Sequence, residues 1–466
     1  MSTPLPLTRA IAAFVSRMGY DDAPPRCIEA ATLGFTDCLG VMIAGADEPA
    51  VRIVAGMLET VSRRDAACQI PSGRLLSASD AALVNGVAAH VLDYDDVAMA
   101  AHPSAVLVPA ILAEGCALDA GGKDAITAYI AGYETWAQLD SLAPDPLQNR
   151  GFHPTAILGA LAAGAACARL RRLDPERTAH AIGIAASMAS GLVANFGSMT
   201  KSLHAGRAAQ SGVVAARLAT DGFTASPDIL EHANGLLRAY FPSAALRVGA
   251  TEYLGVRWRL AARGIDIKRY PTCYATHRCI DAMLALVQEH DLRPEAVSRI
   301  DVRTGATQLL LLRNPAPRNS LEAKFSMNFA VAAALIARRV SLAELTDDFV
   351  CRPDVVAMAA KVHCTTTEEK MPGDELFAPD DRVSVRLASG EALVNPPVTH
   401  AKGSSEQPLA RAEIEEKFLE CVAFAMAHDA ARPLFERLWN LSDVLSLREL
   451  QRGISRSVSS PRSSRG

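Results

Sequence analysis

The spacing of apolar residues is helical from about residue 7 to residue 261. Helix-length segments rich in alanine alternate with short breaks at Gly, Pro or Asp, the residues that mark helix starts and stops. Helices are predicted over residues 81–92, 104–118, 125–139, 156–170, 175–190 and 203–220. Asp80 and Asp124 stand just before two of these segments, so we expect both carboxylates to act as N-caps.

The pattern changes after Gly264, where segments of alternating apolar and polar residues appear. Strands are predicted at residues 298–304, 362–367, 382–387 and 392–394, the last two joined by a turn. Helices are predicted at residues 276–290 and 325–340, with a further helical turn near 342–345. Helical periodicity then returns at 411–428 and 431–441.

These patterns predict a mainly α protein with two domains of unequal size. Residues 1–265 and 401–450, from both chain ends, are expected to form one large helical domain. Residues 266–400 are expected to form a smaller α+β domain inserted between these two parts. The Ser/Arg-rich segment 451–466 has no periodicity and is predicted to be a disordered tail.

Composition narrows the class of protein. Half of the 466 residues are hydrophobic and the formal net charge is −4, so the chain has no overall basic field for nucleic acid. The ten cysteines include no C-x-x-C pair, which is typical of reduced thiols in a cytosolic protein. Segment 181–200 lacks charge but holds few large apolar side chains, which favours a buried helix and a loop over a membrane span. A soluble, cytoplasmic protein without a membrane or nucleic-acid partner is therefore expected.

Motifs for cofactors and metals are missing from the sequence. It contains no G-x-x-x-x-G-K-[ST] loop, no G-x-G-x-x-G between a strand and a helix, and no H-E-x-x-H. No complete set of metal ligands stands at a recognisable spacing. We therefore expect neither cofactor nor metal, and chemistry performed by the chain's own side chains.

Two histidines share one local design. His102 and His153 each precede a proline, and each His-Pro pair precedes a predicted helix. The positive end of the helix dipole disfavours the imidazolium, so both rings are expected to be neutral and able to accept a proton. The alternative is that both are merely residues beside helix caps.

Three carboxylates, Asp93, Asp95 and Asp96, follow the predicted helix 81–92. Acidic groups just past a helix C-terminus oppose the helix dipole, so local stability does not explain them. Either they bind something cationic, or one of them orients a nearby histidine such as His102. A solvated loop is the remaining alternative.

Two groups of cationic residues also lie at predicted helix starts. Lys201 and His204 share a helix face, and a lysine at a helix N-terminus suggests an anion site. Lys268 and Arg269 precede a proline turn and a helix that begins near His277. Exposed charges are the ordinary alternative for each. Taken together, these groups predict a cleft between the domains that binds a small polycarboxylate and holds neutral imidazoles as bases.

Several segments resemble blocks of the MmgE/PrpD family in the same order: HVLDYDD with HPS, GFHPT, TKSLHAGRAAQSG, KRYPTC-x-x-TH and LEAKFSMNFAVAAAL. That family includes 2-methylcitrate dehydratase, cis-aconitate decarboxylase and iminodisuccinate epimerase. The resemblance implies a homodimer with an active site at the domain interface and no cofactor. It also implies acid–base and anion-binding roles for Asp93, His102, His153, Lys201 and Lys268.

Three positions depart from the decarboxylase-like pattern. Val97 stands where that branch has threonine, Cys273 where it has histidine, and Phe329 where it has tyrosine. His277, four residues beyond Cys273, is at a position where the family commonly has histidine and is expected to take over part of that function. Val97 and Phe329 lack the hydroxyl groups of threonine and tyrosine, and this loss favours a reaction that needs fewer acid groups.

The sequence therefore predicts an enzyme that abstracts a proton α to a carboxylate of a small di- or tricarboxylate, with an isomerase of the iminodisuccinate epimerase type as the first choice. An epimerase needs one group to take the proton and another to return it on the opposite face. The alternative is a lyase, either a hydro-lyase of the 2-methylcitrate type or a cis-aconitate-type decarboxylase. A catalytically silent binder of small anions is a third possibility.

Overall fold

The computed structural model describes residues 5–62, 65–142, 146–242, 251, 254–372 and 376–458. The described residues form two compact units, each treated by itself below. Unit 1 draws on Met1–Asn195, Met199–Ile265 and Ala410–Gly466, and unit 2 on Phe196–Ser198 and Asp266–Leu409. Unit 1 is almost entirely helical and unit 2 contains helices and a sheet, so the predicted mainly α fold class is confirmed.

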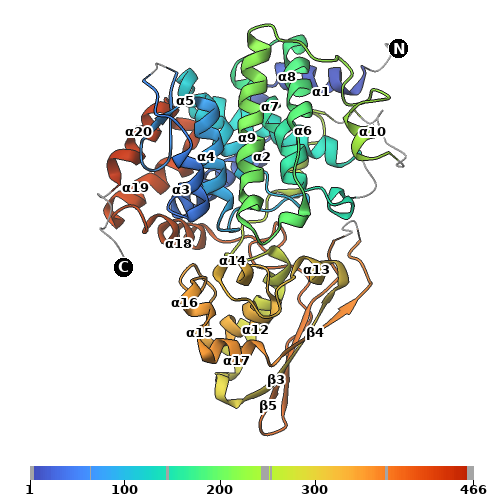
Figure 1. The fold of residues 1–466 in the computed structure, drawn as a ribbon, viewed down its shortest axis with the longest axis vertical. Helices are drawn as coiled ribbons and strands as arrows, with labels where there is room; N and C mark the ends of the chain where they lie inside the picture. The colour runs from blue at the N-terminus through green and yellow to red at the C-terminus, as the bar shows by residue number, and fades with distance from the viewer. Residues whose placement is uncertain are drawn as a thin grey trace. The chain divides into compact units, whose positions relative to one another are not determined.

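Unit 1 contains helices from both ends of the chain. They are α1 (Leu7–Arg17), α2 (Pro25–Gly45), α3 (Pro49–Gly56), α4 (Ala78–His90), α5 (Ser104–Leu118), α6 (Gly122–Asp140), α7 (Pro154–Leu170), α8 (Pro175–Met188), α9 (Met199–Thr220), α10 (Leu236–Tyr240), α11 (Arg259–Arg263), α18 (Arg411–Val422), α19 (His428–Trp439) and α20 (Leu447–Ser457). A short hairpin pairs β1 (Ala67–Cys68) with β2 (Leu75–Leu76). In Figure 1 the red C-terminal helices lie beside the blue N-terminal ones, with α18 and α19 packed on α2 and α20 on α5.

Small residues bring three helices of unit 1 into close contact. A Cβ atom on Gly86 of α4 would lie 2.7 Å from the Cα of Gly206 in α9, and a Cβ on Gly206 would lie 2.4 Å from the Leu83 carbonyl oxygen. On another side of α9, a Cβ on Gly212 would lie 2.3 Å from the Ala163 Cβ of α7. Because glycine has no Cβ, the backbones approach to a distance that any larger residue would prevent.

Helix α2 forms part of this core. It is the one helix in the described ranges that is long and apolar enough to cross a membrane by length and composition alone. It is also largely buried, and it packs against α4, α5, α6 and α18. A helix covered on several sides by others of the same unit has the ordinary character of a core helix. The segment 181–200 consists of the end of α8, a loop with a short 3₁₀ turn (Val193–Asn195), and the first two residues of α9.

Unit 2 is built on a sheet with the strand order β4-β3-β5-β6. Its strands are β3 (Val297–Gly305), β4 (Val362–Thr367), β5 (Arg382–Leu387) and β6 (Ala392–Val394). β3 pairs with β4 in parallel and with β5 antiparallel, and β6 continues the sheet as an antiparallel neighbour of β5. The predicted strand 362–367 is therefore a true edge strand of this sheet.

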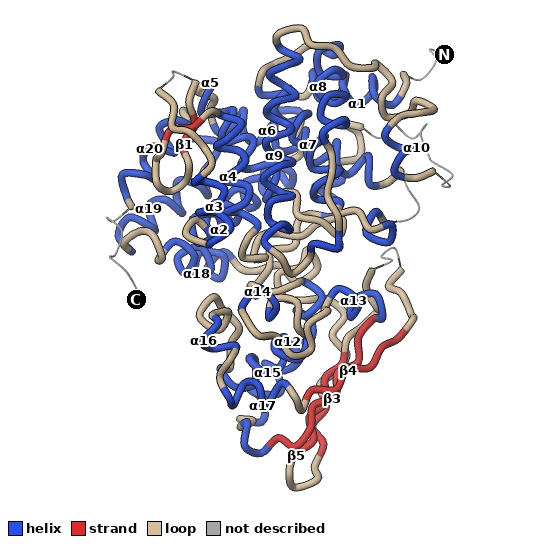
Figure 2. Tube along the Cα trace, in the orientation of Figure 1, coloured by secondary structure: helices blue, strands red, loops and turns tan. Residues whose placement is uncertain are grey.

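Helices separate β3 from β4 in the chain, as a parallel connection requires. Unit 2 contains α12 (His277–His290), α13 (Ala306–Leu311), α14 (Ser320–Ala323), α15 (Met327–Ala337), α16 (Asp347–Val350) and α17 (Pro353–Ala359). In Figure 2, α12, α15 and α17 lie on one side of the red strands, where α12 packs on β5 and α15 on β4. The apolar face of the sheet and these helices form one buried core.

Four local predictions were wrong. Asp80 and Asp124 are not N-caps but third residues of α4 and α6, whose N-caps are Ser77 and Gly121. The Asp80 N–H donates to Ser77 Oγ, and Asp124 Oδ2 accepts from the Gly121 N–H. Residues 342–345 form turns rather than a helical turn.

The predicted disordered tail is the fourth error, because α20 runs through Ser457. Leu447, Leu450, Gln451 and Ile454 are buried along one face of this helix, at helical spacing. The Gln451 amide donates to the Leu112 carbonyl oxygen and accepts from the Cys68 N–H. Residues 459–466 of the predicted tail lie outside the described residues.

Candidate active site

Four helix ends of unit 1 converge on one cluster of ionisable side chains. The cluster contains His90 at the end of α4, the segment Asp93–Asp96, His102 just before α5, His153 at the start of α7, and Lys201 and His204 in the first turns of α9. Except for the partly exposed His102, these side chains are buried. The close contacts of α9 with α4 and α7 hold the helix ends together.

The loop after α4 presents its carboxylates in different directions. Asp93 has a φ of 53°, a left-handed conformation that aspartate tolerates better than most residues. Asp96 caps α5: its Oδ1 accepts from the Ser104 N–H at 3.2 Å and its Oδ2 lies 2.9 Å from Ser104 Oγ. Burial, together with the nearby Asp95 and Asp37 carboxylates, raises the pKa of Asp96 well above its ordinary value. These surroundings therefore favour the protonated form of Asp96.

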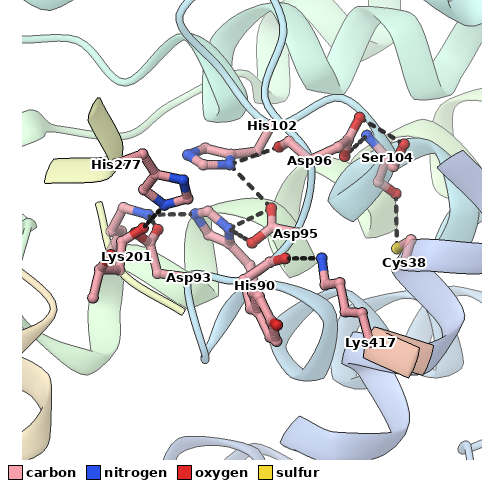
Figure 3. A network of polar contacts seen from close by, with 12 residues as sticks. Cys38, His90, Asp93, Asp95, Asp96, His102, Ser104, Lys201, His277 and Lys417 are labelled. Atoms are coloured by element: carbon pink, nitrogen blue, oxygen red, sulfur yellow. Dashed lines mark hydrogen bonds and ion pairs between the residues drawn. The ribbon is translucent and has the colours of Figure 1, made fainter. Parts of the chain in front are cut away.

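Lys201 joins the start of α9 to this loop. Its ammonium donates to Asp93 Oδ1 at 2.5 Å and to His90 Nε2 at 2.9 Å, and Figure 3 shows the lysine pointing between the two groups. Asp93 supplies the negative charge that a lysine at a helix N-terminus needs. From the sequence, this lysine was interpreted as evidence for a bound anion. The Asp93 carboxylate explains the position of the lysine without a bound anion.

One carboxylate, that of Asp95, lies between two imidazoles. Its Oδ2 is 2.9 Å from His90 Nδ1 and 3.1 Å from His102 Nδ1, as Figure 3 shows. Burial alone would raise the pKa of Asp95, but the two rings hold it well below its ordinary value. Burial, aided by the Lys201 and His102 charges, outweighs the effect of Asp95 and lowers the pKa of His90 to about 3. An ionised Asp95 thus faces a neutral His90.

A second imidazole pair lies beside this cluster. His153 is the N-cap residue of α7, and its Nδ1 is 3.0 Å from Nδ1 of His204. Burial, together with Lys201 and the other rings, lowers the pKa of His153 well below its ordinary value. Burial and then Lys201 lower the pKa of His204 to about 4. Both rings are therefore neutral near pH 7, and one Nδ1 donates to the other.

A buried ion pair supports the loop from the opposite side. Lys417 of α18 lies 2.6 Å from Asp37 of α2 and donates to the Tyr94 carbonyl oxygen at 2.9 Å. Its ammonium also lies 4.0 Å from the centre of the Tyr94 ring, a cation–π distance. The C-terminal part of the chain thus holds the middle of the loop through a single side chain.

One group of residues has the donor types and spacing of a metal site. His90, Asp93, Asp95 and His102 each offer a ligand atom, and these atoms all lie within 4.8 Å of one another. The Lys201 ammonium already contacts two of the four, so a divalent ion would meet a positive charge there. The expected absence of a metal stays a prediction.

The remaining predicted site residues belong to unit 2. Lys268 and His277 are buried and Arg269 is partly exposed. His277 begins α12, and its ring packs against Tyr270 and Tyr274 with centroid distances of 5.1 and 5.0 Å. The prediction that these residues share one cleft with the unit 1 cluster stays a prediction.

The three departures from the decarboxylase-like pattern have different surroundings. Phe329 fills the core of unit 2, where its ring lies edge-on to Phe349. A hydroxyl lost there changes core packing, and it gives the epimerase interpretation no support. Val97 is buried in unit 1, and Cys273 is partly exposed with its N–H bonded to the Lys324 carbonyl oxygen.

The sequence missed His90 and Lys417, whereas Asp95 was named as one of three carboxylates that could orient a histidine such as His102. Asp95 contacts His102 and also His90, five residues before it, because the turn at Asp93 brings the two together. The sequence indicates burial of Lys417 only weakly: this lysine lies on the apolar face of its helix, which Ile414, Phe418 and Cys421 define. Nothing local in the sequence links it to a loop more than 300 residues earlier.

Most of the chain matches one family of proteins. A model of the MmgE/PrpD N-terminal domain matches residues 9–248, and a model of the MmgE/PrpD C-terminal domain matches residues 270–441. The chain therefore belongs to the MmgE/PrpD family.

Three curated proteins that are similar to this chain are named as cis-aconitate decarboxylases. The cis-aconitate decarboxylase of Homo sapiens is 28% identical over 375 residues, which cover 78% of this chain and 76% of the relative. That of Mus musculus is 28% identical over 399 residues (80% and 78%), and that of Aspergillus terreus is 27% identical over 416 residues (83% and 84%). Because all three are decarboxylases, the comparison favours the lyase alternative over the predicted epimerase.

Removing Lys417 should destabilise unit 1. Lys417→Met leaves the Asp37 carboxylate buried without its counter-ion, so we expect the free energy of unfolding to fall by about 3–5 kcal/mol. Chemical denaturation measures this change. The Asp37→Asn/Lys417→Met double variant should recover much of it, since no unpaired charge remains.

Arg411→Met on the same helix is the matched control. It breaks a surface pair with Glu436 in which both side chains are about half exposed, so its cost should be at most about 1 kcal/mol. Equal losses for Lys417→Met and Arg411→Met would contradict the interpretation of Lys417 as a buried structural charge.

Stability should fall when the buried imidazoles are forced to take up protons. An unfolded histidine binds a proton below about pH 6.5, whereas folded His204 does so only below about pH 4. The unfolded chain therefore holds more protons in this interval, and stability is complete above pH 6.5 and is lost as the pH falls towards 4. The melting temperature measured from pH 7 to pH 4 should decline less steeply in His204→Gln than in the wild type. The control is His363→Gln, at an exposed position of β4, whose melting temperature should decline with pH as that of the wild type does. If the melting temperature of His204→Gln declined as steeply as that of the wild type and of His363→Gln, the prediction would be contradicted.

Proposed function

We propose that the protein is a cofactor-independent lyase that acts on a small di- or tricarboxylate through a carbanion next to a carboxylate group. The observation that carries the proposal is the cluster of buried neutral imidazoles around the Lys201–Asp93 ion pair. Family membership and the decarboxylase names of the relatives support the lyase class over an epimerase.

The cluster has the groups that this chemistry needs. In a decarboxylation the C–C bond to the leaving carboxylate breaks, its electron pair stays on the substrate carbon, and an acid protonates that or a conjugated carbon. In a hydro-lyase reaction a base takes the α-proton and an acid protonates the departing hydroxide. Both reactions pass through a carbanion, which a fixed cation stabilises by its charge.

Roles follow from the surroundings of each side chain. His153 carries the proton, because a ring that is neutral near pH 7 accepts one and, once charged, returns it. His102, whose Nδ1 contacts Asp95, is the second proton carrier. Lys201, fixed by Asp93, stabilises the negative charge of the carbanion. His204 supports His153 through the Nδ1–Nδ1 contact and contributes to substrate binding.

The unit 2 residues complete the proposal. Lys268 and Arg269 bind substrate carboxylates, and His277 serves as a further acid–base group. A homodimeric state and a cytoplasmic location, both expected from the sequence, remain part of the same proposal.

A substrate panel followed by proton NMR in D₂O tests the reaction class. The panel contains cis-aconitate, 2-methylcitrate and the iminodisuccinate isomers. A lyase should produce a vinyl resonance that the added substrate lacks, and release of CO₂ separates a decarboxylase from a hydro-lyase. Loss of the α-proton signal with a change in optical rotation, and with neither a new vinyl resonance nor CO₂, would overturn the lyase proposal in favour of an epimerase.

The role of His153 is tested with the substrate that the panel identifies. His153→Gln keeps a polar side chain of similar length but removes the proton carrier, so kcat should fall about 10²- to 10⁴-fold. The KM should change much less, and thermal denaturation checks that the variant is folded. His363→Gln, an exposed histidine of unit 2, should retain wild-type turnover. Full turnover by folded His153→Gln would exclude it as an acid–base group.

A further inference from the structure

The Asp95 carboxylate contacts the same nitrogen on two different rings. Its oxygens lie 2.9 and 3.1 Å from His90 Nδ1, and its Oδ2 also lies 3.1 Å from His102 Nδ1. The Asp95 side chain is fully buried. Because an ionised carboxylate only accepts hydrogen bonds, both Nδ1 atoms must carry a hydrogen.

The far nitrogen of His90 is then determined as well. A neutral ring with hydrogen on Nδ1 has a lone pair on Nε2, and that atom lies 2.9 Å from the Lys201 Nζ. The lysine is a donor to Nε2 and to Asp93 at once. The chain Asp95–His90–Lys201–Asp93 therefore has a donor and an acceptor at every contact.

His102 is held in the same tautomer by two acceptors. Its Nδ1 lies 3.1 Å from the Asp96 carbonyl oxygen in addition to Asp95. When Nε2 carries no hydrogen, its lone pair takes up a proton as the ring acts as a base.

We propose that Asp95 is a positioning residue that holds His90 and His102 together in the Nδ1–H tautomer, so that His90 anchors the Lys201 ammonium and His102 presents Nε2 as a base. The tautomer assignment stands on the contacts alone. The consequence for turnover rests on the proposed function, in which His102 and Lys201 take part.

Asp95→Asn tests the assignment, because an amide has one acceptor end and one donor end. Both rings contact Oδ2 and His90 Nδ1 also contacts Oδ1, so in either orientation the NH₂ group lies beside His90 Nδ1 and requires an acceptor there. His102 has the Asp96 carbonyl oxygen to keep its hydrogen on Nδ1, so we expect His90 to change. His90 would then carry its hydrogen on Nε2, opposite the Lys201 ammonium, and the His90–Lys201 contact would be lost.

Asp96→Asn is the matched control. Asp96 is the next residue, it is equally buried, and its carboxyl group contacts Ser104 rather than an imidazole. An asparagine can replace it in both contacts with the Ser104 N–H and Oγ. The two variants thus remove neighbouring carboxyl groups, only one of which contacts the rings.

The measurement is long-range ¹H–¹⁵N NMR of the full chain labelled with ¹⁵N-histidine, which distinguishes a protonated from an unprotonated ring nitrogen. Comparison with His90→Gln and His102→Gln assigns the signals. We expect Nδ1–H on both rings in the wild type and in Asp96→Asn, and Nε2–H on His90 in Asp95→Asn. The wild-type spectrum decides the assignment even if Asp95→Asn fails to fold: Nε2–H on either ring in the wild type would overturn it. An identical change in both variants would also overturn it, because the effect would then be a general disturbance of the loop.

Turnover separates this proposal from the proposed function. With the substrate found in the panel, kcat of Asp95→Asn should fall at least 10-fold with a smaller change in KM, while His363→Gln stays within about 3-fold of the wild type. The expected tautomer change without any loss of turnover would overturn the positioning role of Asp95. A wild-type protein inert towards every member of the panel would count against the proposed function alone, since the NMR assignment does not depend on activity.

Discussion

The close contact of α4 with α9 at Gly86 and Gly206 is the constraint on which the candidate site depends. It brings the C-terminus of one helix beside the N-terminus of the other, so His90 meets Lys201 at hydrogen-bonding distance. The contact of α9 with α7 near Gly212 brings the N-terminal parts of these two helices together, so His204 meets His153. Side chains whose polar atoms lie 2.9 and 3.0 Å apart across two helices tolerate little change in helix spacing, and the missing Cβ atoms hold that spacing.

Burial of so many ionisable groups requires that each charge be compensated, and unit 1 does so in three ways. Asp93 and Asp37 are paired with lysines, and Asp95 is held by two imidazole N–H groups. For Asp96 the protonated form is favoured, because burial and its acidic neighbours raise its pKa. The same burial keeps the imidazoles neutral. The electrostatic arrangement that makes the cluster tolerable in the folded chain is also the one that acid–base chemistry near pH 7 requires.

A shared carbanion explains how one constellation can serve several reactions in a family. Proton removal, decarboxylation and dehydration differ in which bond breaks, but each leaves negative charge beside a carboxylate, where a cation and a proton carrier are needed. The residues that supply these functions therefore identify the class of chemistry more firmly than the particular reaction. Phe329 illustrates the difference, because a substitution that seemed to bear on the reaction lies in the core of unit 2.

The sequence by itself determined the helices, the strands and most of the chemical groups. Apolar periodicity located α4 to α9, α18 and α19 of unit 1 and the strands of unit 2. His102, His153 and Lys201 stood out because each was poorly explained by its own helix end. The sequence misplaced features that depend on distant contacts, such as the stretch of α20 that is anchored through Gln451. Only the tertiary structure decided that Asp95 serves two histidines and that Lys417 holds the loop through the Tyr94 carbonyl oxygen. Periodicity records which face of an element is buried, whereas a hydrogen bond between remote segments depends on how those elements pack, and no local pattern encodes that.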